Sequence, residues 1–221
     1  MRTIHRRITR RAPLITGAIA IALLAALLRG PCRPDLPRTP PPAIPIRKTV
    51  ATVFDGDTLS TTDGLRIRLL GIDAPEALTP FADEARDCVR RRVDGKPVIL
   101  VYDTEREDSY GRTLAHVFVE SAGGEQLVAE EVVRRGLAMV YLKPPNLLFA
   151  ERLIAAQRAA VEEKIGIWSV PVKPEKTYVA GAYRFHRPSC PHAREVERPR
   201  IATDRTALLK EGKSPCRTCR P

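Results

Sequence analysis

Three carboxylates and two arginines in the first half of the chain form a set suited to phosphate chemistry. Asp57 begins one strand of a predicted hairpin and Asp73 follows the end of the next strand, so a hairpin can bring the two acids together. Carboxylate oxygens are the usual ligands of hard cations such as Ca²⁺, and Glu76 lies near enough in sequence to handle a water molecule. Arg68 and Arg112 carry planar guanidinium groups that match phosphate oxygens. The set predicts metal-assisted hydrolysis of a phosphodiester bond.

The stretch VFDGDTL, residues 53–59, places two of these acids around a glycine. Asp-Gly is first of all a turn signal, so Asp55 and Asp57 can also be turn and strand-end acids that bind no metal. A carboxylate removed from water is costly unless it is paired with a cation or bound to a metal. The motif DGD alone therefore leaves both interpretations open, and the other motifs must decide between them.

The surrounding pattern predicts the elements that must hold these side chains. Apolar and polar residues alternate from residue 49 onward, and Asp63-Gly64 is a hairpin turn signal between two such runs. Strand patterns come first and helical spacing follows, which favours an α+β fold in which helices pack against a small β-barrel. The later predicted strands are residues 96–103 and 113–119. The predicted helices are one that is capped by Thr79 and begins at Pro80, one over 125–136 that ends at Gly136, and one over 146–166 that ends at Gly166.

Five sequence blocks occur in a fixed order over residues 49–170: FDGDTL, IRLLGIDAPE, DSYGRTLAHVFV, VRRGLAMVYL and IGIWS. Together they resemble the staphylococcal nuclease (thermonuclease) family. The resemblance implies an OB-fold, a five-stranded β-barrel with about three helices. It also implies hydrolysis of DNA or RNA that leaves a 3′-phosphate.

The resemblance also implies a role for each residue of the predicted site. The family's calcium ligands fall on Asp57, Asp73 and the backbone carbonyl of Ala74. Its general base falls on Glu76, and its two phosphate-binding arginines fall on Arg68 and Arg112. The family's positions beside the metal or near the nucleotide fall on Asp55, Tyr110 and Tyr141.

A second unit is expected over residues 175–221, which are short, basic and poor in core residues. His186 and Cys190 form one close pair, and Cys216 and Cys219 form another about 25 residues later. Two such pairs predict a structural zinc site with four protein ligands, and the metal would stabilise a unit this small. A disulfide or free thiols remain the alternative, because export would expose the cysteines to oxidation.

The tail also resembles the zinc domain of the Ada-type methyl-phosphotriester repair proteins, through RPSC, RTALLKEG and PCRTC. In that family the first zinc ligand is a nucleophilic cysteine that accepts a methyl group. His186 stands at that position here, and an imidazole keeps the zinc without being that acceptor. The resemblance therefore implies a binding or structural module, which we do not expect to be a repair enzyme.

The N-terminal segment, residues 1–30, places five arginines before an apolar run. This pattern is typical of a signal anchor or a signal peptide, and the arginines should stay on the cytoplasmic side. Residues 31–48 are rich in proline and predict an extended linker. We expect an exported protein with a single pass through the inner, cytoplasmic membrane and its catalytic domain outside the cytoplasm, or a secreted one if the signal is cleaved.

The net charge of +11 is distributed unevenly, with +9 from residues 1–49, −5 from residues 50–170 and +7 from residues 171–221. Non-specific attraction to nucleic acid comes from neutralising phosphates, so the tail is the part of the exported chain best suited to it. One hypothesis is a calcium-dependent nuclease that acts on DNA or RNA. The alternative is a non-catalytic nucleic-acid-binding protein with a degenerate barrel and a zinc binding module. The filled catalytic positions favour the nuclease.

Overall fold

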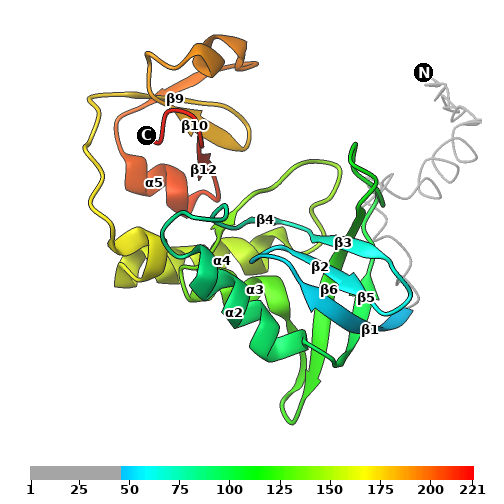
Figure 1. Cartoon of the computed structure of the whole chain (residues 1–221). Coiled ribbons are helices and arrows are strands. Elements are labelled where there is room, and N and C mark those ends of the chain that lie inside the picture. The colour runs from blue at the N-terminus through cyan, green and yellow to red at the C-terminus, as the bar shows by residue number, and fades with distance from the viewer. Residues whose placement is uncertain (1–45) are drawn as a thin grey trace, which may run out of the picture. The chain divides into compact units, whose positions relative to one another are not determined.

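A closed β-barrel forms the first half of the described chain (Figure 1). The structure is a computed structural model that describes residues 46–221. Neighbouring strands follow the order β3-β2-β1-β5-β6, and a parallel pairing of β3 with β6 closes the ring. This confirms the predicted five-stranded barrel and is consistent with an OB-fold. The barrel strands are β1 (Ile46–Val53), β2 (Thr58–Thr61), β3 (Arg66–Leu69), β5 (Pro97–Val101) and β6 (Thr113–Ser121).

The predicted signal segment, residues 1–30, and most of the predicted linker, residues 31–48, lie outside the described residues. Among the helices that the structure describes, none is long and apolar enough to cross a bilayer.

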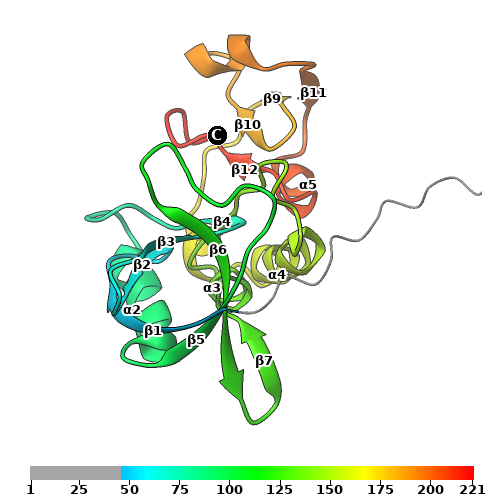
Figure 2. The ribbon, with the colours of Figure 1, turned by 90° about the vertical axis from the view of Figure 1, so that its right-hand side faces the viewer.

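Turns and further short strands connect or extend the barrel strands. The predicted hairpin is confirmed, with Gly64 at a φ of 84° in the turn between β2 and β3. This left-handed conformation explains a glycine at that position. A second two-stranded sheet pairs β4 (Ile72–Asp73) with β8 (Met139–Val140). The strand β7 (Gly124–Leu127) pairs with the end of β6, and this hairpin projects away from the barrel, as Figure 2 shows.

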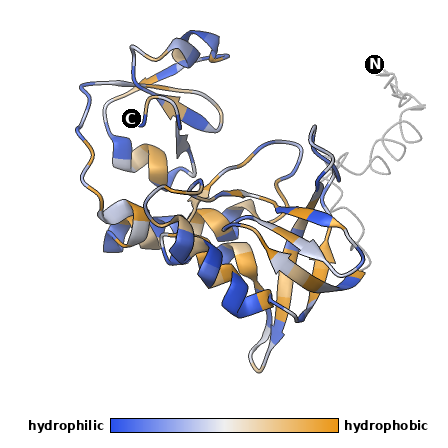
Figure 3. Cartoon of the chain, in the orientation of Figure 1, coloured by the Kyte–Doolittle hydropathy of each residue, from blue (hydrophilic) through white to orange (hydrophobic). Residues whose placement is uncertain are grey.

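Three helices pack against the barrel, as expected, but each begins a few residues later than predicted. They are α2 (Ala82–Val93), α3 (Val128–Arg134) and α4 (Ala150–Glu163). The helix α2 does not begin at Pro80, because Thr79 instead donates a hydrogen bond to the Glu76 carbonyl in the preceding turn. The helix α3 begins at Val128, because Leu127 is still paired with Phe118 in a strand. Figure 3 shows hydrophilic residues along the outer side of α2, as expected for a helix with one face on the core.

Gly136 ends α3 as predicted, directly after the cap residue Arg135 and at a φ of 66°, whereas Gly166 is not the residue that ends α4. The helix α4 begins at Ala150, later than expected, and ends at Glu163, with Lys164 in the left-handed conformation as its cap. The two glycines also contact each other. The Gly136 carbonyl accepts a hydrogen bond of 2.8 Å from the Ile167 amide, at the start of η1 (Gly166–Ser169). A Cβ on Gly166 would lie 2.1 Å from the Gly136 oxygen. Both positions therefore need glycine because two segments of backbone touch.

The C-terminal residues form a small sheet with one helix, which we call the C-terminal module (residues 175–221). Its strands follow the order β11-β9-β10-β12, and β10 runs parallel to β12. Its core is larger than the sequence suggests, because Tyr178, Phe185, Leu208 and Leu209 pack with Val161 of α4. Figures 1 and 2 both show α5 beside α4. The elements are β9 (Tyr178–Ala180), β10 (Arg184–His186), η2 (Pro191–Glu195), β11 (Arg200–Ala202), α5 (Arg205–Lys210) and β12 (Ser214–Pro215).

Candidate active site

The barrel brings the two predicted calcium carboxylates together at one end. Asp57 and Asp73 are both buried, and a carboxylate oxygen of Asp57 accepts a hydrogen bond from the Ala74 amide at 2.8 Å. Asp55 accepts one from the Asp57 amide, also at 2.8 Å, which supports the turn. Gly56 is required between them, because a Cβ there would lie 2.7 Å from the Cβ of Ala74. The motif DGD therefore forms a turn and also supplies one of the two buried carboxylates of the site.

Arg68 lies between these carboxylates. Its Nε is 3.1 Å from Asp57 Oδ1 and its Nη2 is 3.2 Å from Asp73 Oδ1. Burial raises the pKa of Asp57, and the nearby Arg68 charge opposes that rise. The guanidinium therefore compensates much of the negative charge that burial makes costly.

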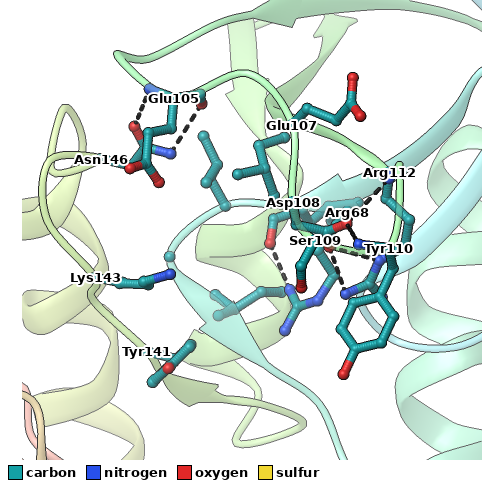
Figure 4. Close-up of a pocket in the computed structure, with 15 residues that line it drawn as sticks. Arg68, Glu105, Glu107, Asp108, Ser109, Tyr110, Arg112, Tyr141, Lys143 and Asn146 are labelled. Carbon is teal, nitrogen blue, oxygen red and sulfur yellow. Dashed lines mark hydrogen bonds and ion pairs between the residues drawn. The ribbon is translucent and has the colours of Figure 1, made fainter.

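The second predicted arginine lies in an adjoining pocket of about 450 Å³ (Figure 4). Arg112 donates from Nε to Asp108 Oδ2 at 2.8 Å, and its guanidinium lies 5.5 Å from the ring centroid of Tyr110. Asp108 is a functional candidate that the sequence reasoning missed, although its place in the block DSYGR, four residues before the arginine, was an available signal. The pocket is also lined by Arg68, Tyr141 and Lys143. A phosphate with its nucleotide is the kind of ligand that two arginines and two tyrosines suit.

Glu76 lies on an exposed turn after Asp73, and its carboxylate pairs with Arg217 of the C-terminal module. The same guanidinium holds Asp73 and the Ala74 carbonyl, at 2.8 Å for Nε to Asp73 Oδ2 and 2.9 Å for Nη2 to the Ala74 oxygen. Arg184 adds a longer contact, 3.4 Å to Asp73 Oδ2. No sequence signal indicated these contacts, since the sequence predicts Arg184 and Arg217 only as part of the basic tail that could hold nucleic acid.

The donor set at this end of the barrel fits a hard cation. Its atoms are the carboxylate oxygens of Asp57 and Asp73 and the backbone oxygen of Ala74, and all three residues are buried together. Oxygen donors of this kind are what Ca²⁺ uses in proteins. The guanidinium of Arg217 already contacts two of these three residues, Asp73 and Ala74, which shows that the site favours positive charge.

The four predicted zinc ligands also come together. Ligand atoms of His186, Cys190, Cys216 and Cys219 lie within 4.8 Å of one another, with three of the residues buried. Nδ1 of His186 is buried and has no hydrogen-bond partner. One imidazole nitrogen and three thiol sulfurs fit a tetrahedral zinc site. The described cysteines form no disulfide, and Cys88 lies apart in the barrel core, as predicted for a small buried apolar residue.

Comparison with known proteins agrees with the fold. A family model described as "Staphylococcal nuclease homologue" matches residues 66–170. The thermonuclease of Staphylococcus hyicus is 36% identical over 129 residues, which are 54% of this chain and 74% of that protein. The thermonuclease of Staphylococcus intermedius is 33% identical over 128 residues, with the same two coverages. A protein of Escherichia coli described as an uncharacterized endonuclease is 34% identical over 134 residues, which are 58% of this chain and 82% of that protein.

Proposed function

The chain belongs to the family of staphylococcal nuclease homologues, and we propose that it is a calcium-dependent nuclease whose active site contains Asp57, Asp73, Glu76, Arg68 and Arg112. It is a hydrolase that acts on phosphodiester bonds, and its substrate is nucleic acid. The observation that supports a calcium-dependent active site at these residues is the burial of Asp57 and Asp73 together beside Arg68. A binding protein without catalysis has no need of this costly arrangement.

The chain's own residues divide the reaction between them. Asp57, Asp73 and the Ala74 carbonyl would hold Ca²⁺, which supplies positive charge at a phosphate oxygen when bound. Glu76 is exposed on its turn and accepts the proton of the attacking water through its carboxylate. Arg68 and Arg112 donate hydrogen bonds to phosphate oxygens, where charge develops during the attack.

Three further residues support this site. Asp108 orients Arg112 through the ion pair between them. Tyr110 and Tyr141 line the pocket that would hold the nucleotide. The expected product carries a 3′-phosphate, as the family resemblance implies.

The remaining parts of the proposal concern the rest of the chain. We assign structural zinc to His186, Cys190, Cys216 and Cys219, supported by their proximity and by the unpartnered His186 nitrogen. The arginines and apolar run of residues 1–30 support export and a membrane anchor.

The test is cleavage of single-stranded DNA and RNA by the full chain, purified with its zinc and kept soluble in detergent. Cleavage should require Ca²⁺ and stop in a calcium chelator, and Glu76→Ala should lower its rate by about 100-fold or more. Glu84→Ala is the matched control, because it removes an exposed acid on α2 and should leave the rate unchanged. A folded protein that binds the nucleic acid without calcium-dependent cleavage would favour the non-catalytic alternative.

A further inference from the structure

Arg217 occupies the oxygen atoms that the proposed function assigns to the calcium ion and the attacking water. Its Nε and Nη2 hold the two carboxylate oxygens of Asp73, at 2.8 Å and 2.5 Å, and Nη2 also donates to the Ala74 carbonyl at 2.9 Å. Its Nη1 pairs with the carboxylate of Glu76. A two-point contact between a guanidinium and a carboxylate is among the stronger ion pairs in proteins. Calcium and Arg217 therefore cannot use these oxygens at the same time.

Arg184 strengthens the same arrangement from the neighbouring strand. Its Nη2 lies 3.4 Å from Asp73 Oδ2, and its guanidinium lies 4.4 Å from the ring centroid of Tyr141. Tyr141 lines the pocket assigned to the nucleotide. The C-terminal module thus contacts both the cation site and the nucleotide pocket.

The cysteine–histidine cluster sets the place of both arginines. Arg217 lies between the cluster residues Cys216 and Cys219, and Arg184 lies two residues before His186 on β10. The strands β10 and β12 pair side by side, and the Cys216 amide donates to the Phe185 carbonyl at 2.9 Å. A metal bound at the cluster would hold the backbone on both sides of Arg217.

Packing on α4 keeps the module in this position independently of the active-site ion pairs. Gln157 is fully buried, accepts a hydrogen bond from the Val140 amide at 2.7 Å and donates one to the Leu209 carbonyl at 2.6 Å. Arg158 donates to the Lys210 carbonyl at 2.7 Å. The Arg217 side chain is 37% exposed, so it can leave the carboxylates by rotating about its own bonds while the module stays docked.

We propose that Arg217 is an internal competitor of calcium, so that the C-terminal module holds the active site closed until calcium and nucleic acid are present together. This inference rests on the proposed function. The competition follows from position and charge, because the Arg217 guanidinium lies on the Asp73 and Ala74 oxygens that the metal would use, and two positive groups cannot share them. Phosphates of a bound nucleic acid give Arg217 and Arg184 new acceptors and so favour the open arrangement.

Calcium affinity, measured by calorimetry on the zinc-loaded full chain without nucleic acid, tests the competition directly. Arg217→Ala should bind calcium about tenfold more tightly than the unmodified chain, as expected if the closed arrangement is about 90% populated. Arg194→Ala is the matched control, because it removes an exposed arginine of the same module, and it should change the affinity less than twofold. Asp73→Asn should lose the binding and so identify the site.

Equal calcium affinity in the unmodified chain and Arg217→Ala would overturn the competition while leaving the proposed nuclease intact. A lower cleavage rate in Arg217→Ala with unchanged calcium affinity would also overturn it and make Arg217 a substrate-binding residue. An absence of calcium binding in both proteins would overturn the proposed function together with this inference.

Discussion

The side-chain amide of Gln157 donates a hydrogen bond to the backbone carbonyl of Leu209, and this contact joins α4 to the C-terminal module. The side-chain oxygen of Gln157 accepts a hydrogen bond from the backbone amide of Val140 in β8. The buried Gln157 side chain therefore links β8, which pairs with the strand of Asp73, to α5, which contributes Leu208 and Leu209 to the core of the module. This link is one of several contacts that fix the position of the module relative to the active site.

Gln157→Leu is expected to lower the free energy of unfolding by about 1–3 kcal/mol, because it leaves the buried Val140 amide without a partner and removes one of the two hydrogen bonds to the Leu209 carbonyl. Chemical denaturation of the full chain measures the change. Gln126→Leu is the control, since Gln126 is exposed on β7, and it should change stability by less than about 0.5 kcal/mol. A Gln157→Leu protein as stable as the control would show that the link contributes little.

Asp108→Asn is expected to lower kcat by about tenfold or more and to change KM less, because Asp108 orients Arg112 without touching the phosphate. Arg112→Lys should lower the rate further, since an ammonium cannot make the two-point contact of a guanidinium. In the double variant, Asp108→Asn should add almost nothing to the loss. Fully additive losses would contradict a shared role.

Cys190→Ala is expected to remove most of the zinc that copurifies with the full chain, because a structural zinc site needs all four ligands. Metal analysis by mass spectrometry measures the content. Cys88→Ala should keep its zinc, since Cys88 lies in the barrel core and outside the cluster. Equal zinc loss in both variants, or none in either, would argue against the assigned ligands.

His116 should make the fold sensitive to acid. Its ring is buried, neither ring nitrogen has a hydrogen-bond partner, and Asp103 lies 3.8 Å from Nε2, too far for a hydrogen bond. Burial lowers the pKa of His116 from 6.5 to about 4. The unfolded chain therefore takes up a proton first as the pH falls below about 6.5, and stability is lost down to about pH 4.

At pH 5 this loss should be about 2 kcal/mol relative to pH 7.5. His116→Leu removes the titrating group, so its stability relative to the unmodified chain should rise by about that amount between the two pH values. Denaturant titration of both proteins at each pH measures the difference. A difference that does not depend on pH would show that His116 does not control the acid sensitivity.

Several parts of the fold follow from local residue types. Asp63-Gly64 predicts the hairpin because Gly64 adopts a positive φ that few other residues adopt, and the structure has this turn. Helix starts are less predictable, as Thr79 and Leu127 show, because their backbone groups bond to neighbours outside the helix. Gly136 and Gly166 read as helix stops, yet their contact with each other depends on two segments that meet only in the folded barrel.

Residue types and short spacings specify the chemistry available to this protein: carboxylates and arginines in ordered blocks for phosphate hydrolysis, and histidine and cysteine pairs at a metal-ligand spacing. Those features are local, since residue type and short spacing set ligand chemistry and turn geometry. The contact between Arg217 and Asp73, which are 144 residues apart, arises from the folded chain. That contact depends on how α5 packs on α4, and packing between distant segments is not encoded in any one motif.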